Sequence, residues 1–139
     1  MKVLNIGSLN LDHVYSVDHI VLPGETQATF GMNVFLGGKG INQSIALAKA
    51  GADVYHGGLI GTDGALFLDA CKEYGVKSDY IRQIDAKTGH AIIQIDKNAQ
   101  NCILLYGGAN EMLTEEYIDE VLNNFSSEDM LLLQNEVNM

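Results

Sequence analysis

The sequence has 139 residues, 47% of them hydrophobic, which is enough for one folded domain with a buried core. Its 8 Lys and Arg residues against 18 Asp and Glu give a net charge of −10 and leave no basic stripe, so we expect no nucleic-acid binding. No apolar run reaches the length of a membrane span, so we expect no membrane insertion.

The cysteines, the histidines and the N-terminus exclude several kinds of site. Cys71 and Cys102 lie far apart and form no C-x-x-C pair, so we expect two free thiols. The chain starts with a strand-like run rather than a cleavable signal, and we therefore expect a cytoplasmic protein. The histidines follow none of the common metal-ligand spacings, and we predict no metal site.

The first predicted strand, residues 3–6, ends at Gly7 and is followed closely by Asn10 and Asp12. Ligands of open α/β sheets bind beyond the carboxyl ends of the strands, so these two side chains are well placed for a site. A carboxylate can accept hydrogen bonds from two neighbouring hydroxyls, and an amide can both accept and donate, which suits a neutral polyol. The alternative is an Asx turn whose side chains face water.

Residues 36–44 have the sequence Leu-Gly-Gly-Lys-Gly-Ile-Asn-Gln-Ser and pass directly into a helical pattern. Glycines let the backbone approach a ligand closely, and the helix start offers unpaired N–H groups at the same place. Gly38, Lys39 and Asn42 would then contribute backbone, a charged donor and an amide. Neither a Walker loop nor a dinucleotide fingerprint is present, because Lys39 precedes another glycine and Gln43 stands where the fingerprint needs one. The alternative is a helix start whose glycines serve tight packing only.

Strand-like segments within residues 13–36 and 89–105 interrupt the strand–helix alternation expected of an α/β protein. The individual predicted strands cover residues 13–17, 28–35, 89–96 and 101–105. We expect them to form a small sheet of their own, with a hairpin that turns through residues 97–100. The alternative is that they extend the main sheet.

The other elements alternate between strand and helix. We predict a strand at residues 54–59, a helix at residues 63–74 and a further helix that begins near Thr114. Asp63 and Thr114 are the predicted N-terminal caps, and Gly75 ends the first of these helices. The predicted buried face of that helix comprises Leu66, Ala70 and Tyr74.

Residues 130–133 are Met-Leu-Leu-Leu, a continuous apolar run typical of a parallel-sheet strand whose two faces are covered by helices. Glu136 follows just past the carboxyl end of this strand, at the edge where ligands bind. The alternative for a single glutamate at this place is a solvated carboxylate.

The run from Gly37 to Ser44, followed by Gly51 and Gly61, resembles the first signature of the ribokinase (PfkB) carbohydrate kinase family. The resemblance covers the whole chain, which corresponds to roughly the N-terminal half of such a kinase. It implies an α/β fold with Rossmann-type αβα layers and a small β-sheet lid, in which residues 1–139 form the N-terminal part of one ribokinase-like domain. The chain departs from the family at Leu66, where a glycine is usual, and this departure affects packing rather than the site.

The resemblance implies an ATP-dependent sugar kinase that transfers the γ-phosphoryl group of ATP to a primary hydroxyl of a pentose such as ribose. It also implies a homodimer joined through the lid strands. The residues that match the acceptor-binding positions of the family, and that we expect to hold the sugar, are Asn10, Asp12, Gly38, Lys39, Asn42 and Glu136.

The second signature of the family, a D-T-x-G-A-G-D run, does not occur in this sequence. The resemblance places the base aspartate of that run beyond Met139, together with the sites for MgATP and for a monovalent cation such as K+. We therefore expect no catalytic residue in this chain and no activity from the chain alone, since phosphoryl transfer needs a positioned base and donors for the phosphoryl oxygens. The alternatives are a non-catalytic sugar-binding or regulatory module and a truncated fragment without a function of its own.

Overall fold

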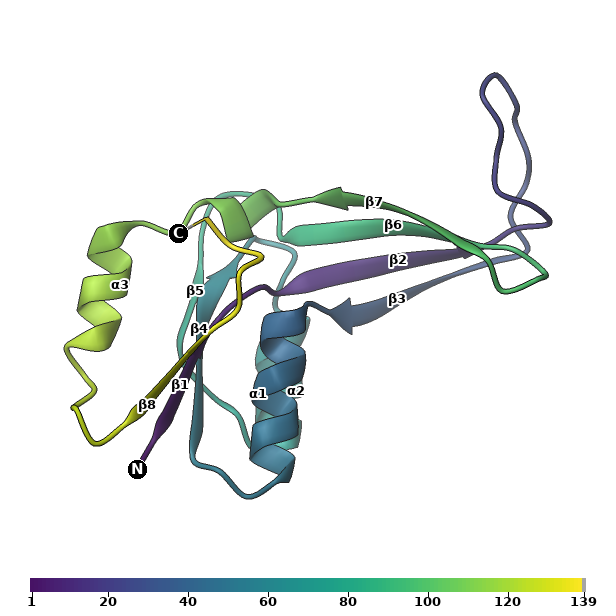
Figure 1. Cartoon of the computed structure of the whole chain (residues 1–139). Helices are drawn as coiled ribbons and strands as arrows, with labels where there is room; N and C mark the ends of the chain where they lie inside the picture. The colour runs from purple at the N-terminus through teal and green to yellow at the C-terminus, as the bar shows by residue number, and fades with distance from the viewer. Residues whose placement is uncertain (139) are drawn as a thin grey trace.

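A parallel sheet with helices on both faces forms the body of the protein. The computed structural model describes residues 1–138, and its main sheet has the strand order β5-β4-β1-β8, all parallel. The bounds are β1 Val3–Ile6, β4 Val54–Ile60, β5 Lys77–Gln83 and β8 Met130–Leu133. Helices α1 (Lys39–Lys49) and α2 (Leu66–Tyr74) lie on one side of this sheet and α3 (Glu115–Leu122) on the other, as Figure 1 shows. The expected α/β layers are confirmed.

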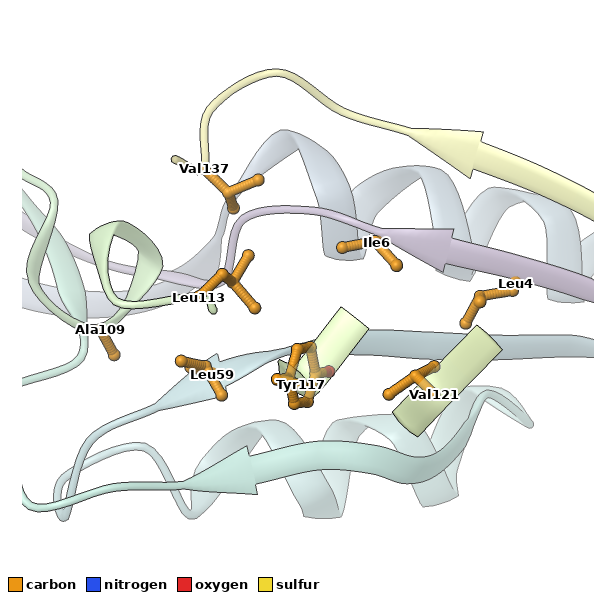
Figure 2. Packing of buried hydrophobic residues seen from close by; sticks show 8 residues of the cluster. All are labelled: Leu4, Ile6, Leu59, Ala109, Leu113, Tyr117, Val121 and Val137. Atoms are coloured by element: carbon orange, nitrogen blue, oxygen red, sulfur yellow. The ribbon is translucent and has the colours of Figure 1, made fainter. Parts of the chain in front are cut away.

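Two hydrophobic clusters, one on each face of the main sheet, hold the layers together. The cluster under α3 comprises Leu4, Ile6, Leu59, Ala109, Leu113, Tyr117, Val121 and Val137, and Figure 2 shows these side chains. The cluster under α1 and α2 comprises Leu9, Leu11, Ile41, Ile60, Phe67, Cys71 and Val76. All of β1 is buried because both of its faces are covered, and Val3, Leu4 and Ile6 are accordingly apolar, while the polar Asn5 is hydrogen-bonded.

A second four-stranded sheet extends away from the main one, as the upper right of Figure 1 shows. Its order is β3-β2-β6-β7, with bounds β2 Asn10–Ser16, β3 Gly31–Gly37, β6 Gly89–Ile95 and β7 Asn101–Tyr106. The short 3-10 helix η1 (Gly108–Glu111) returns the chain to the main sheet. The alternative that these segments extend the main sheet is therefore wrong. Strand β2 begins at Asn10, so the alternative of an Asx turn there is also wrong.

Asp63 does not cap α2, contrary to the sequence prediction. The helix begins at Leu66, and its N-cap residue is Ala65, which makes no side-chain cap bond. The Asp63 carboxylate instead accepts hydrogen bonds from the Thr88 backbone N–H at 2.9 Å and from its hydroxyl at 2.7 Å. Burial alone would raise the pKa of Asp63, but these bonds and one from Lys87 outweigh it and lower the pKa to about 2. Asp63 thus ties the turn after β4 to the start of β6.

The buried face of α2 also differs from the prediction. Phe67, Ala70 and Cys71 are buried, whereas Leu66 and Tyr74 are exposed, because the helix turns its i, i+3, i+4 set toward the sheet. Strand β5 was not predicted, since Lys77–Gln83 is a polar edge strand without clear alternation. The other local signals are confirmed. Gly75 ends α2 in the left-handed region at φ 75°, and Thr114 caps α3 by accepting from the Tyr117 N–H at 3.2 Å.

Candidate functional site

A pocket of about 260 Å³ opens where the two sheets meet. All residues that the sequence predicted for the acceptor site line it: Asn10, Asp12, Gly38, Lys39, Asn42 and Glu136. The other lining residues are Ala91, Ile93, Ile103 and Leu105 from β6 and β7. The structure therefore brings together side chains from both ends of the chain, and what they bind stays a prediction.

The parallel pairing of β1 with β8 explains why Glu136 reaches this pocket. Ile6 is in register with Leu133, so both strands end at the same edge, and the Gln134 N–H donates to the Ile6 carbonyl at 3.0 Å. The Gln134 Oε1 atom then accepts from the Ser8 N–H at 3.2 Å and from the Ser8 hydroxyl at 2.9 Å. Glu136, two residues further on, accepts from the same hydroxyl at 3.2 Å and pairs with Lys39. The hydrogen bond from Lys39 lowers the pKa of Glu136 below its usual value.

The glycine-rich loop is shaped by close packing against the end of β1. Gly38 has φ 104°, a conformation that side chains disfavour, and a Cβ atom there would lie 2.6 Å from the Ser8 carbonyl oxygen. A Cβ atom on Gly40 would overlap the backbone of Gly7 and Ser8. Tight packing, the alternative explanation for these glycines, therefore applies to Gly38 and Gly40.

Two of the first N–H groups of α1, those of Gly40 and Ile41, are not free for a ligand, which corrects that part of the sequence prediction. The Gly40 N–H donates to the Ser8 hydroxyl at 3.4 Å, and the Ile41 N–H donates to the Ser8 carbonyl at 3.1 Å. The helix start thus contributes the side chains of Lys39 and Asn42 to the pocket, while the N–H groups of Gly40 and Ile41 hold the turn after β1.

A fully buried chain of hydrogen bonds lies beneath the loop. The Asn5 amide nitrogen donates to the Gly40 carbonyl at 2.8 Å and to the Ser44 hydroxyl at 3.0 Å. Ser44 Oγ lies 2.8 Å from His56 Nδ1, and His56 Nε2 lies 3.2 Å from the Gly7 carbonyl. Because that carbonyl can only accept, Nε2 carries the proton and Nδ1 accepts from Ser44. Burial lowers the pKa of His56 to about 4, so its ring is neutral at pH 7.

Asp12 is a half-buried carboxylate that makes no hydrogen bond within residues 1–138. A Cβ atom on Gly37, in the neighbouring strand β3, would overlap this carboxylate, so glycine there makes room for it. Burial raises the pKa of Asp12, and the neighbouring His13 lowers it to a smaller extent. A half-buried carboxylate without a protein partner is open to a ligand that donates, such as a hydroxyl group.

Sequence reasoning missed two parts of the site. Asn110, 2% exposed, holds Asn10 through a hydrogen bond of 2.8 Å, and no local pattern in the sequence indicated this contact. The apolar wall from β6 and β7 was also missed. Its members Ala91 and Ile93, like Ile103 and Leu105, stand two positions apart, so the period-two pattern of a strand would have placed each pair on one face.

Residues 1–138 contain neither a membrane-spanning helix nor a metal-ligand cluster. None of the described helices combines the length and the apolar character that a membrane span requires. Nowhere in the described part of the chain do three His, Cys, Asp or Glu side chains come together as metal ligands would. Cys71 and Cys102 are free thiols, the first buried and the second exposed, as the sequence predicted.

Comparisons with known proteins agree with this geometry. Residues 1–138 match the sequence profile of the pfkB family carbohydrate kinases. The ribokinase of Haemophilus influenzae is 37% identical over 132 residues, which cover 93% of this chain and 43% of that protein. The chain thus spans less than half the length of that relative.

Solved structures give the same result. A ribokinase from Thermotoga maritima has a TM-score of 0.90 and 39% identity, covering 99% of this chain and 46% of that one. The Arabidopsis thaliana ribokinase complexed with ribose and ATP has a TM-score of 0.79 and 29% identity, covering 98% of this chain and 46% of that one. With a family match over nearly its whole length, this chain belongs to the pfkB family of carbohydrate kinases.

Proposed function

We propose that this chain is the acceptor-binding part of an ATP-dependent sugar kinase that phosphorylates a primary hydroxyl of a pentose such as ribose. The observation that carries the proposal is the convergence of Asn10, Asp12, Lys39, Asn42 and Glu136 on one pocket between the two sheets. The ribose and ATP in the Arabidopsis thaliana ribokinase structure support the choice of ligand class.

The pocket combines the two surfaces that a sugar offers to a protein. Asp12 and Glu136 accept hydrogen bonds from hydroxyls, Lys39 donates, and the amides of Asn10 and Asn42 can do either. The apolar side chains of β6 and β7 would cover the C–H groups of the ring and keep water out. Because Lys39 and Glu136 neutralise each other and Asp12 adds a further carboxylate, the pocket suits a neutral polyol more than an anion.

The second sheet would act as a lid over the sugar. Strands β6 and β7 supply the apolar wall of the pocket, and β7, the edge strand of this sheet, is exposed along its whole length. An exposed strand with Leu104, Leu105 and Tyr106 on its surface invites pairing with a second copy, so we propose a homodimer through this sheet. A cytoplasmic location is part of the same proposal.

The residues present do not fit MgATP or a monovalent cation by themselves. The N–H groups of Gly40 and Ile41 at the start of α1 are already bonded to Ser8, and residues 1–138 hold no cluster of metal ligands. Asp12 and Glu136 are the carboxylates of the pocket, and in this proposal they bind sugar hydroxyls rather than a nucleotide-bound metal ion. The chain therefore positions the acceptor, and the base and the donors for the phosphoryl group would come from a second half.

A non-catalytic sugar-binding module is the second candidate, favoured by the same lack of phosphoryl-binding groups in the described residues. A direct test compares the 139-residue chain with a fusion of this chain to the C-terminal part of the Haemophilus influenzae ribokinase. Both are incubated with MgATP, K+ and ribose, and ADP is measured.

The fusion should turn over, with rates on the order of 1–100 per second for a typical kinase, while the chain alone should be silent. If both proteins bind ribose but the folded fusion forms no ADP, the non-catalytic module is favoured. Sugar-dependent ADP formation by the chain alone would contradict the division of labour proposed here, and absence of ribose binding by both would contradict the ligand class.

A further inference from the structure

Asn110 is a buried polar residue that contacts the pocket only through another side chain. It lies in η1, is 2% exposed, and is separated by 100 positions from Asn10, to which it is hydrogen-bonded. Its remaining hydrogen bonds go to the backbone of Leu9, so it uses both ends of its amide. A buried amide with this many partners has one orientation, because turning it would oppose donor to donor and acceptor to acceptor.

The backbone of Leu9 determines which end of each amide faces which way. The Leu9 N–H can only donate a hydrogen bond, so the Asn110 side-chain atom that lies 3.0 Å from it must be the amide oxygen. The nitrogen of Asn110 then faces the Leu9 carbonyl at 3.1 Å and Asn10 at 2.8 Å. Because this nitrogen can only donate, the Asn10 atom that meets it is Oδ1.

The amide nitrogen of Asn10 is therefore left for the pocket. Within the part of the chain that the structure describes, Asn10 Nδ2 donates to no protein group, and Asn10 lines the pocket. Asp12, two positions along β2, is on the same face of the strand and offers only acceptor atoms. The site thus presents a donor and an acceptor side by side.

We infer that Asn110 is a positioning residue, which orients Asn10 so that the pocket selects a ligand hydroxyl that accepts from Asn10 and donates to Asp12. One hydroxyl has one proton, so it can satisfy both residues only in this arrangement. Gly89 contributes space, because a Cβ atom there would overlap both the Asn110 nitrogen and the Asn10 oxygen. This inference rests on the proposed function, since it takes the ligand to be a polyol.

The test measures the binding of ribose and of its singly deoxygenated analogues to the full 139-residue chain by calorimetry. Asn110→Asp keeps the oxygen that accepts from Leu9 and removes the donor to Asn10. Asn10→Asp keeps the acceptor for Asn110 and replaces the pocket-facing donor by an oxygen. Asn98→Asp, at the exposed β6–β7 turn, adds the same charge away from the pocket and serves as the control.

The analogue that lacks the hydroxyl shared by Asn10 and Asp12 should bind to the wild-type chain and to Asn98→Asp about tenfold or more weaker than ribose does. It leaves the Asn10 donor and the Asp12 acceptor unpaired. In Asn110→Asp and Asn10→Asp, ribose itself should bind at least about tenfold weaker, and the preference over that analogue should fall toward one. General destabilisation would not remove the preference for a single hydroxyl, so the ratio separates positioning from folding.

The side-chain amide resonance of Asn10, assigned by its loss in Asn10→Asp, gives a second readout that needs no variant of Asn110. It should shift when ribose is added to the wild-type chain. Ribose binding without that shift, or an unchanged ribose-to-analogue ratio in Asn110→Asp, would overturn the inference. A wild-type chain that binds no ribose would instead overturn the proposed function.

Discussion

Lys39 and Glu136 form an ion pair at the pocket although 97 positions separate them in the sequence. The pair connects the start of α1 to the segment after β8, and Glu136 is held from its other side by the Ser8 hydroxyl at 3.2 Å. Both residues were predicted as sugar ligands, and the structure shows that they also neutralise each other. A sugar hydroxyl placed between them would accept from Lys39 and donate to Glu136.

Glu136→Gln should weaken ribose binding while changing stability little. The Lys39 side chain is 73% exposed, so solvent screens the pair and its contribution to the free energy of unfolding is at most about 1 kcal/mol. The pKa of Glu136 is lowered in the folded chain, so this contribution is present above the ordinary value of 4.5 and is lost as the pH falls through the lowered one.

Calorimetry with ribose and urea unfolding at pH 7 check both statements, with Glu128→Gln, an exposed position, as the matched control. Unchanged ribose affinity in Glu136→Gln would contradict the assignment of Glu136 to the acceptor site.

Acidification should destabilise the chain through His56. Its pKa is lowered from 6.5 to about 4 by burial, so below pH 6.5 the unfolded chain binds a proton that the folded chain does not. Stability from this group is complete above pH 6.5 and declines toward pH 4, by roughly 3 kcal/mol in all. Urea unfolding between pH 7 and pH 4 should show a shallower decline in His56→Gln than in the wild type. Parallel pH profiles for the two proteins would contradict the neutral, buried ring.

Gly40→Ala should lower both stability and sugar affinity, because its methyl group would push α1 off the backbone of Gly7 and Ser8. Forcing extra atoms into a packed site costs about 1–3 kcal/mol, and the shift would move Lys39 and Asn42 with the helix. Gly31→Ala is the control, since a Cβ atom there meets nothing within 4 Å. Thermal unfolding and ribose calorimetry give the comparison, and equal behaviour of the two variants would refute the packing role of the loop.

Much of the site could be predicted because its residues follow strand ends and a glycine-rich helix start and also match the acceptor-binding positions of the PfkB family. These positions lie at one edge of a parallel sheet whatever the details of packing, which is why Asp12 and Glu136 could be assigned to one pocket. The fold class rested on the resemblance of the glycine-rich run to the PfkB family, together with the alternation of strands and helices.

The parts that sequence reasoning missed depend on contacts between distant segments. Ser8 accepts a hydrogen bond from the Gly40 N–H because Gly40 packs closely against Gly7. No local sequence pattern indicates that this packing occurs. Asp63 looked like a helix cap because it stands before a helix, but Thr88, from a different connection, supplies better donors. Asn110 was missed because its partner lies 100 positions away.

The 139-residue chain should self-associate through the uncovered side of its main sheet. Edge strand β8 exposes Met130, Leu131 and Leu133, and an apolar pocket of about 410 Å³ opens between this strand and α3. Leu131→Lys should reduce association there, whereas Leu104→Lys on β7 should act on the proposed lid dimer. Light scattering of both variants across a concentration series checks this. No change in Leu131→Lys would mean that the β8 side does not drive association.

The most direct test of the central claim is ribose binding to the wild-type chain and to Asp12→Asn, measured by calorimetry at pH 7 with thermal unfolding in parallel. Burial raises the pKa of Asp12, so the ionised carboxylate is unfavourable in the fold, and a neutral amide should not lower the melting temperature. Ribose affinity should nevertheless fall about tenfold or more, because the amide replaces one of the two acceptor oxygens by a donor that opposes a donating sugar hydroxyl. Equal affinity of the two folded proteins for ribose would contradict the acceptor site described here.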